Sequence, residues 1–267
     1  MRVRLLPRAD LSTLCCDAIA TSANAGLVGN ANPAFWRFAG RRNADGAVHR
    51  AAGPELAHAC AELAAVEAGS GARCRVGEVV VTPGIFGRLR TDAVLHAVAP
   101  DGAYAVGLQR WMGSRRWSGG QNATAGTSGA VHLEEARPAG EARDILQATT
   151  AAILEAAESC SAGSVGIPAV GCGVLGWNPT VAAEVALRAM CAHFAARPDG
   201  GGSIERIDVA LFSDAAFAAW SASFTEIIGP PSRQAGETPA LAGGSNAGEA
   251  MGGGSEEYDL RRWLAAQ

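Results

Sequence analysis

Hydrophobic positions along this chain form short runs of strand length that alternate with longer runs of helical period. The short runs are rich in β-branched residues and predict strands at Val3–Leu6, Asp17–Ser22, Glu78–Pro83, Ala93–Val98, Val165–Val170 and Ile204–Phe212. The longer, Ala-rich runs predict helices at Asp45–Ala52, Pro54–Glu67, Glu141–Ser159, Pro179–Phe194 and Ala215–Ile227, with Asp45 and Asp214 as candidate helix caps. Strands that alternate with helices predict an α/β fold with helices on both faces of the sheet.

The stretch Val165–Thr180 combines a buried strand, a glycine-rich turn and a helix start. Its three glycines let the backbone approach an anion closely, and Asn178-Pro179 is typical of an N-cap followed by the first helical residue. Free N–H groups and the positive end of the helix dipole then favour bound phosphate. The spacing also fits the dinucleotide pattern G-x-G-x-x-G, which is a weak signal in a chain with 34 glycines. A plain Gly-rich turn is the alternative.

Composition narrows the class of protein. A formal net charge of -4 and a pI near 5.8 argue against nonspecific binding to nucleic acid. The seven cysteines include no C-x-x-C pair, so neither a metal site nor a disulfide framework is indicated. No apolar run is long enough to cross a bilayer, and the N-terminus lacks the apolar stretch of a secretion signal. We therefore expect an intracellular protein, cytoplasmic or nuclear, without a cofactor or metal.

The predicted elements lie in one domain, residues 1–228. Residues from about 100 to 140 are rich in Gly, Ser and Arg, and predict a long surface insertion that is partly mobile. From Gly229 onward Pro, Gly, Ser and Ala dominate, which predicts a disordered tail over residues 229–267. Within that tail Tyr258–Leu264 could form a short helix.

Several sequence blocks, in order, resemble the macro domain family. The matching blocks are Asp10-Leu-Ser12, Asp17-Ala-Ile-Ala-Thr-Ser-Ala-Asn24, Ala44-Asp-Gly-Ala-Val-His-Arg-Ala-Ala-Gly-Pro-Glu-Leu56, Gly77–Thr82, Val94–Pro100 and Ile167-Pro-Ala-Val-Gly-Cys-Gly-Val-Leu-Gly176. The resemblance covers roughly Val3–Ile228 without the insertion. It implies a three-layer α/β/α fold around a central mixed, mostly parallel sheet.

The family binds ADP-ribose, many members hydrolyse ADP-ribosyl bonds, and the resemblance implies both for this chain. Asp10 would accept a hydrogen bond from the adenine amino group, and Phe212 would stack on adenine. Asn24 would hold the distal ribose, Asp45 would position or activate water, and His49 would steady that site. The other implied ligand-binding residues are Leu11, Gly46, Val48, Gly171, Cys172, Gly173, Val174, Leu175 and Gly176, and the loop residues would donate backbone N–H groups to the diphosphate. The implied partner is ADP-ribose or an ADP-ribosylated protein, and we expect a monomer.

The implied chemistry suits these residue types. A ribosyl bond breaks through an oxocarbenium-like transition state, which a nearby carboxylate stabilises while it takes a proton from water. Plainer readings remain open: Asp45 could be a helix cap, and His49 a packed helix residue. His96 is expected to be structural. Cys172 is expected to be a small packing residue rather than a nucleophile.

Two other functions stay in view. The family usually carries three glycines before its Asp-Gly pair, whereas Arg41-Arg42-Asn43 stand there in this chain, and Leu175 replaces a usual aromatic residue. A non-catalytic reader of ADP-ribose is therefore an alternative to a hydrolase. A Rossmann-type NAD(P) oxidoreductase is a more distant one, because its glycine loop belongs in the first βαβ unit whereas Gly171–Gly176 comes late in the chain.

Overall fold

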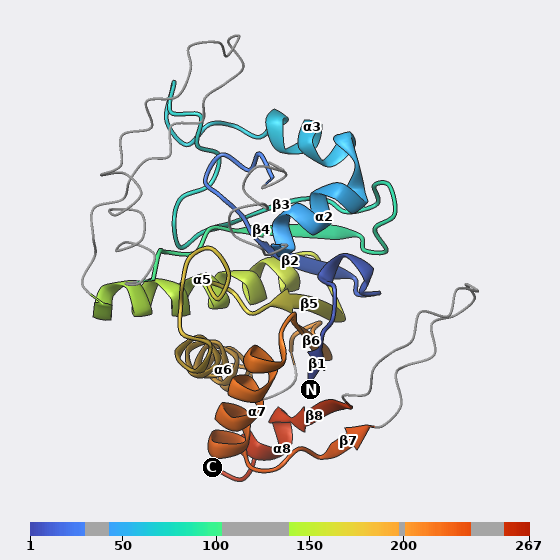
Figure 1. The fold of residues 1–267 in the computed structure, drawn as a ribbon, viewed down its shortest axis with the longest axis vertical. Helices are drawn as coiled ribbons and strands as arrows, with labels where there is room; N and C mark the ends of the chain where they lie inside the picture. The colour runs from blue at the N-terminus through green and yellow to red at the C-terminus, as the bar shows by residue number, and fades with distance from the viewer. Residues whose placement is uncertain (30–42, 103–138, 198–200, 236–253) are drawn as a thin grey trace.

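A mixed eight-stranded sheet in the order β3-β4-β2-β5-β6-β1-β8-β7 runs through the computed structural model (Figure 1). The structure describes residues 1–29, 43–102, 139–197, 201–235 and 254–267. The strands are β1 (Arg2–Pro7), β2 (Ala18–Ser22), β3 (Val79–Pro83), β4 (Ala93–Ala97), β5 (Ser164–Pro168), β6 (Arg206–Leu211), β7 (Arg233–Ala235) and β8 (Ser255–Asp259). The five strands from β4 to β1 are parallel, and β3, β8 and β7 pair antiparallel.

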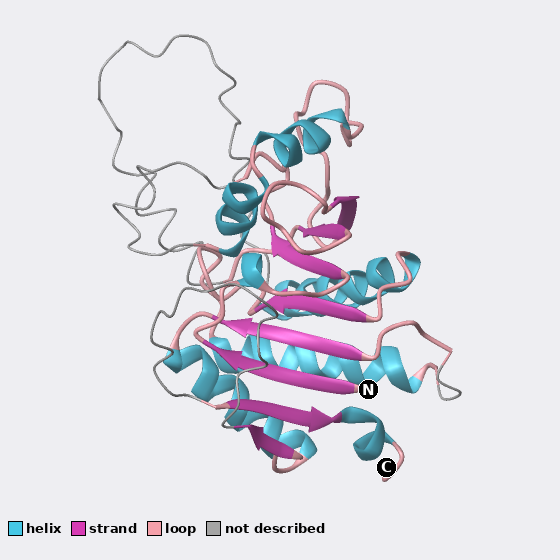
Figure 2. Cartoon of the chain, turned by 90° about the vertical axis from the view of Figure 1, so that its right-hand side faces the viewer, coloured by secondary structure: helices cyan, strands magenta, loops and turns pink. Residues whose placement is uncertain are grey.

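Helices cover both faces of this sheet. The helices are α2 (Ala44–Ala52), α3 (Pro54–Glu62), α5 (Ala139–Ser159), α6 (Pro179–Ala195), α7 (Asp214–Ile228) and α8 (Leu260–Leu264), with a 3-10 turn, η1, at Leu11–Thr13. Figure 2 shows the strands in front of the longest helices. Successive residues of β2 face opposite ways: Ala18 and Ala20 pack with the core under α5, α6 and α7, whereas Ile19 packs with the core under α2 and α3. The predicted three-layer α/β/α fold with a mostly parallel sheet is confirmed.

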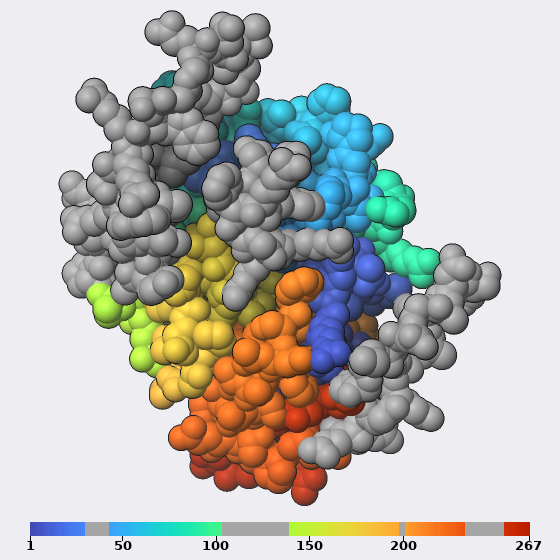
Figure 3. Space-filling view, in the orientation of Figure 1, coloured from blue at the N-terminus to red at the C-terminus, as the bar shows by residue number. Residues whose placement is uncertain are grey.

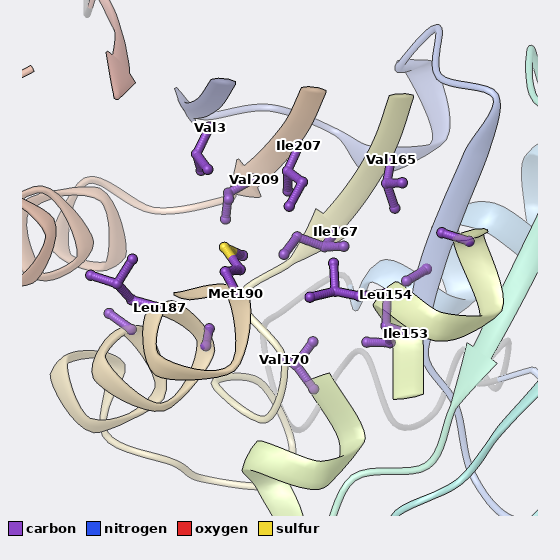
Figure 4. Packing of buried hydrophobic residues seen from close by; sticks show 14 of the residues in the cluster. Val3, Ile153, Leu154, Val165, Ile167, Val170, Leu187, Met190, Ile207 and Val209 are labelled. Atoms are coloured by element: carbon purple, nitrogen blue, oxygen red, sulfur yellow. The ribbon is translucent and has the colours of Figure 1, made fainter. Parts of the chain in front are cut away.

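The larger core lies between the central strands and the helices α5 and α6. Figure 4 shows Met190 of α6 directed toward Val209 of β6 and Ile167 of β5, with Leu154 of α5 beside them. All four side chains are at most 1% exposed. Burial of a side chain of this size typically contributes about 1.5–3 kcal/mol, so this layer holds α5 and α6 firmly against the sheet.

Two helix starts and one helix end differ from the predictions. The side-chain oxygens of Asn43 and Ser213, rather than those of Asp45 and Asp214, cap α2 and α7. Sequence position alone could not separate these neighbours, because all four residue types are good caps. The predicted helix Pro54–Glu67 ends at Glu62, where Leu63 turns to extended backbone. Among the described residues, no helix has the length and apolarity needed to cross a membrane.

The C-terminal segment is folded, which contradicts the prediction of disorder for residues 254–267, although the short helix suggested at Tyr258–Leu264 is present as α8, Leu260–Leu264. Strand β8 pairs with β1, and Figure 3 shows the red C-terminal segment at the lower edge of the molecule, partly covered by the orange segment that includes α7. Tyr258 is 1% exposed, and its ring meets that of Phe224 edge-on at a centroid distance of 5.2 Å. One buried aromatic residue therefore anchors a segment whose composition predicted disorder. Residues 236–253, and most of the predicted insertion at 103–138, lie outside the described residues.

Candidate functional site

Four candidate segments follow parallel strands at one edge of the sheet. Asn24 comes after β2, the loop of residues 171–176 after β5, Phe212 after β6, and Asp10 after β1. Because those strands are adjacent in the order β2-β5-β6-β1, the four segments emerge side by side in that same order. Ligands of open α/β sheets bind outside the carboxyl ends of the strands. This edge is the candidate site.

The loop after β5 offers unpaired backbone donors. Its turn is closed by hydrogen bonds from the Gly176 N–H to the Gly173 carbonyl at 3.2 Å and from the Trp177 N–H to the Gly171 carbonyl at 3.0 Å. The N–H groups of Gly173, Val174 and Leu175 bond to nothing within the described part of the chain. Gly173 and Val174 are also exposed. Consecutive free N–H groups in such a turn form a concave anion site.

Residues that follow β4 hold the same loop through two hydrogen bonds. The Trp177 indole N–H donates to the Pro100 carbonyl at 2.8 Å, and the Gly102 N–H donates to the Leu175 carbonyl at 2.7 Å. Gly171 has φ +83°, and a Cβ there would lie 2.5 Å from the Trp177 ring. The sequence therefore requires glycine at position 171 for both backbone conformation and space.

The first turn of α6 contributes less to this site than the sequence predicted. The Asn178 side chain caps α6 by accepting from the N–H groups of Thr180 at 2.9 Å and Val181 at 3.4 Å. Those two donors are therefore already engaged. The free N–H groups of the loop, rather than those of the helix start, are therefore the donors available to an anion.

At one end of the edge, Asp10 and Phe212 come from neighbouring strands. The register pairs Pro7 of β1 with Leu211 of β6, so the residues that follow both strands emerge together. Asp10 caps η1: its Oδ1 accepts from the Ser12 N–H at 3.0 Å and from the Ser12 hydroxyl at 2.7 Å. Phe212 is 58% exposed, so much of its ring is open to solvent. A fixed carboxylate and an open aromatic face suit a purine base.

At the other end, the loop that carries Asn24 lies against α2. Asn24 accepts from Leu27 and Val28 through its carbonyl and its Oδ1, at 2.9 and 3.4 Å, which shapes the turn. Gly29 then packs on the His49 ring so closely that a Cβ would lie 2.7 Å from Cγ. The residues assigned to the distal ribose are thus held by one packed unit.

Asp45 lies inside this unit rather than on its surface. It is 2% exposed, and its Oδ1 lies 3.8 Å from Nε2 of His49, one turn further along α2. Because Asn43 caps the helix by accepting from the Gly46 N–H at 2.6 Å, the plain reading of Asp45 as the cap is wrong. A carboxylate and an imidazole are therefore buried together at the start of α2.

Beneath His49 lies a second buried imidazole, His96 of β4. Its Nε2 lies 2.9 Å from the Thr82 hydroxyl and 3.6 Å from the Cys60 thiol. Burial, helped by the charge of His49, lowers the pKa of His96 to about 3, so this ring is neutral. The structural role predicted for His96 fits this packing. Cys60 and Thr82 were missed, because nothing in their local pattern separates them from ordinary core residues.

Most of the remaining candidate ligand-binding residues are packed into the structure around the site. Leu11 and Val48 are buried in one apolar cluster with Leu27, which ties η1 to α2. Gly46 is buried in the first turn of α2. Burial raises the pKa of the Cys172 thiol to about 12, which keeps it protonated and a poor nucleophile. This favours the packing role predicted for Cys172.

The fold and site define an α/β domain with a loop of free N–H groups at the carboxyl edge of a mixed sheet. A family model described as Macro domain matches residues 31–107. An O-acetyl-ADP-ribose deacetylase of Salmonella gallinarum is 31% identical over 179 residues, covering 67% of this chain and 72% of the relative. A macro domain-containing protein of Ralstonia nicotianae is 29% identical over 82% of this chain and 92% of its own length. This chain belongs to the macro domain family.

A solved structure shares the fold. The Trypanosoma brucei macrodomain in complex with ADP-ribose aligns with a TM-score of 0.54 at 23% identity, covering 81% of this chain and 67% of that chain. Because the chain belongs to the macro domain family, its glycine spacing at Gly171–Gly176 does not require the first βαβ unit of a Rossmann fold.

Proposed function

We propose that this protein binds ADP-ribose along the carboxyl edge of its sheet and hydrolyses ADP-ribosyl linkages, of mono-ADP-ribosylated protein or of small ADP-ribose derivatives. The observation that carries the proposal is the order of the segments along the edge. It presents, in sequence, an amide, a row of free N–H groups, an open aromatic ring and a carboxylate. That order matches distal ribose, diphosphate and adenine. Relatives named as an O-acetyl-ADP-ribose deacetylase and a macrodomain in complex with ADP-ribose support it.

Each end of the ligand would meet a different kind of contact. The adenine ring stacks on Phe212, and its amino group donates to Asp10, which η1 holds in place. The diphosphate accepts from the N–H groups of residues 173–175. Hydrogen bonds to charged groups contribute roughly 1.5–3 kcal/mol each, so the loop supplies the largest share of affinity.

The chemistry would take place at the distal ribose, beside Asn24 and α2. Asn24 bonds to ribose hydroxyls without adding charge. Asp45 accepts a proton from the attacking water or stabilises positive charge at the anomeric carbon. His49, 3.8 Å from the Asp45 carboxylate, holds that group from one turn further along the helix. General-base help of this kind is typically worth about 10²–10⁴-fold in rate.

A non-catalytic reader is the second candidate, and the burial of Asp45 favours it. At 2% exposure this carboxylate meets little bulk water. Asn43, however, stands at one of the three positions where the family usually has glycine. Its side chain accepts from the Gly46 N–H as the helix cap, so this replacement is accommodated without intruding on the site. The two candidates differ in turnover and share the same binding edge.

One experiment separates them. Full-length protein is incubated with O-acetyl-ADP-ribose and with a mono-ADP-ribosylated protein, free ADP-ribose is quantified by chromatography, and ADP-ribose binding is measured by calorimetry. The hydrolase predicts turnover that falls about 10²–10⁴-fold in Asp45→Ala while Asp144→Ala, an exposed control, retains it. Tight binding without product selects the reader, and absence of binding overturns both. The monomeric state and the intracellular location stay predictions from the sequence.

A further inference from the structure

Three metal-binding side chains meet beneath the start of α2. His49 comes from α2, Cys60 from α3 and His96 from β4, and all three are buried. One ring nitrogen of each histidine and the cysteine sulfur lie within 4.8 Å of one another. Three different elements thus place one soft donor, a sulfur, and two borderline donors, both ring nitrogens, close together in the interior.

The distance between two of these donors already suits a metal. The Cys60 Sγ and the His96 Nε2 are 3.6 Å apart. In a tetrahedral zinc site, with Zn–S near 2.3 Å and Zn–N near 2.0–2.1 Å, a sulfur and a nitrogen ligand lie about 3.6 Å apart. The Thr82 hydroxyl lies 2.9 Å from the same nitrogen, so a metal would replace Thr82 as the partner of that nitrogen.

The third residue, His49, has a ring nitrogen without a hydrogen bond among the described residues. Nε2 of His49 makes no hydrogen bond within the described part of the chain, although the residue is only 7% exposed. Oδ1 of Asp45 lies 3.8 Å from this nitrogen, near enough for an ion pair with a protonated ring but beyond hydrogen-bond range. A buried polar atom without a partner typically costs about 1–3 kcal/mol. A bound cation would satisfy this nitrogen.

We propose that His49, Cys60 and His96 form a binding site for a thiophilic divalent transition metal, with zinc as the ion that fits best. Thiolate and imidazole ligands select zinc over magnesium and calcium, which prefer oxygen. On binding, the S–H bond of Cys60 breaks, its proton goes to solvent and a sulfur–metal bond forms. A neutral imidazole at His96 needs no such loss. The ion would join α2, α3 and β4.

This site shares His49 with the proposed hydrolysis, so its test uses metal binding rather than activity. Metal-free full-length protein is titrated with Co²⁺, whose visible bands report tetrahedral geometry and whose near-ultraviolet charge-transfer band reports a thiolate ligand. We expect saturation at about one equivalent per chain, with three protein ligands in a tetrahedral site. Added Zn²⁺ should then remove the bands.

Two matched variants test the ligand set. Cys60→Ser should lose the charge-transfer band and bind at least about tenfold more weakly, the loss that even outer-shell partners of metal ligands produce. Cys191→Ser, at a half-buried thiol of α6, should behave like the parent protein. The melting temperature without metal shows whether each variant is folded. Absence of visible bands in the parent protein, or an unchanged band in Cys60→Ser, overturns the proposal.

A measurement without any substitution covers the case in which Cys60→Ser fails to fold. X-ray absorption at the zinc edge of the parent protein should give one sulfur and two imidazole nitrogens as ligands. The melting temperature should also rise with zinc concentration, because the ion binds the folded state. A ligand shell of oxygen and nitrogen alone would overturn the assignment.

Discussion

The indole N–H of Trp177 donates a 2.8 Å hydrogen bond to the carbonyl of Pro100, which joins the loop after β5 to the chain after β4. A second bond, from Gly102 to Leu175, lies beside it. The protein's own hydrogen bonds therefore hold the free N–H groups of residues 173–175 in place without a ligand. Such preorganisation raises affinity, because less ordering remains to be done on binding.

Removing only the indole donor tests this arrangement. In Trp177→Phe the ring still packs near Gly171, but the bond to Pro100 is lost. A hydrogen bond contributes about 1 kcal/mol net, so the Kd for ADP-ribose should rise about fivefold in calorimetry. Trp263→Phe, in α8, removes a similar donor elsewhere and should leave Kd unchanged. Equal affinity of Trp177→Phe and the parent protein would show that the hydrogen bond from Trp177 to Pro100 does not shape the loop.

Two glycines of the same loop should respond differently to an added methyl group. Gly171 has φ +83° and a Cβ there would meet the Trp177 ring at 2.5 Å, whereas no atom lies within 4 Å of a Cβ at Gly173. Gly171→Ala should therefore lower the free energy of unfolding by about 1–3 kcal/mol. Gly173→Ala should change it by less than about 0.5 kcal/mol. Urea denaturation measures both, and equal effects would contradict the described loop conformation.

Much of this fold could be predicted from hydrophobic pattern, because strands and helices with a clear period bury one face each. The strands at Ala93–Ala97 and Val79–Pro83 and the helix at Pro179–Ala195 lie within a residue or two of their predicted bounds. Strand β8 was missed, since its sequence carries one apolar residue, Tyr258, between acidic ones. Its burial depends on Phe224, which no local pattern reveals.

The buried end of the chain makes a prediction about stability. Tyr258 packs on Phe224, and its hydroxyl lies 2.8 Å from Glu256 and 3.2 Å from Thr225. Tyr258→Ala should lower the free energy of unfolding by about 3–5 kcal/mol, and Tyr258→Phe by about 1 kcal/mol, because the ring remains. Denaturant unfolding at neutral pH measures both. A Tyr258→Ala protein as stable as the parent would mean that this segment contributes nothing to the fold.

Acid stability should depend on Glu158 at the end of α5. Burial raises the pKa of Glu158, but the N–H and hydroxyl of Ser203 and the His193 ring outweigh it, so the pKa lies below its usual 4.5. A lowered pKa in the folded state stabilises it above pH 4.5, and this contribution is lost as pH falls through the folded value. Glu158→Gln should thus be less stable by about 1.5–3 kcal/mol at pH 7, with the difference shrinking in acid.

The matched control for that experiment is Glu155→Gln. Glu155 is more exposed and pairs with Arg197 at the surface, so its loss should change the free energy of unfolding by at most about 1 kcal/mol. Unfolding followed from pH 7 to pH 3 gives both profiles. A Glu158→Gln difference that stays constant or grows in acid would contradict the assignment.

The placement of Asn24 and Phe212 just after strands could be predicted from the sequence, whereas their roles stay predictions. The sequence could not predict which of two neighbouring residues caps a helix, or which side chains the fold buries. Asn43, rather than Asp45, caps α2, and this places the Asp45 carboxylate inside the unit formed with His49. Cys60 becomes a candidate metal ligand only because its Sγ lies 3.6 Å from Nε2 of His96. The two residues are 36 positions apart in the chain, so no local pattern relates them.

The central claim is that one edge of the sheet binds ADP-ribose from end to end, and a calorimetric titration of ADP-ribose tests it most directly. We predict saturable one-to-one binding that weakens about 10–100-fold in Phe212→Ala, where base stacking worth about 1–3 kcal/mol is lost. Binding should also weaken in Gly171→Ala, at the diphosphate loop. No binding by the parent protein, or binding that neither substitution alters, would contradict the account.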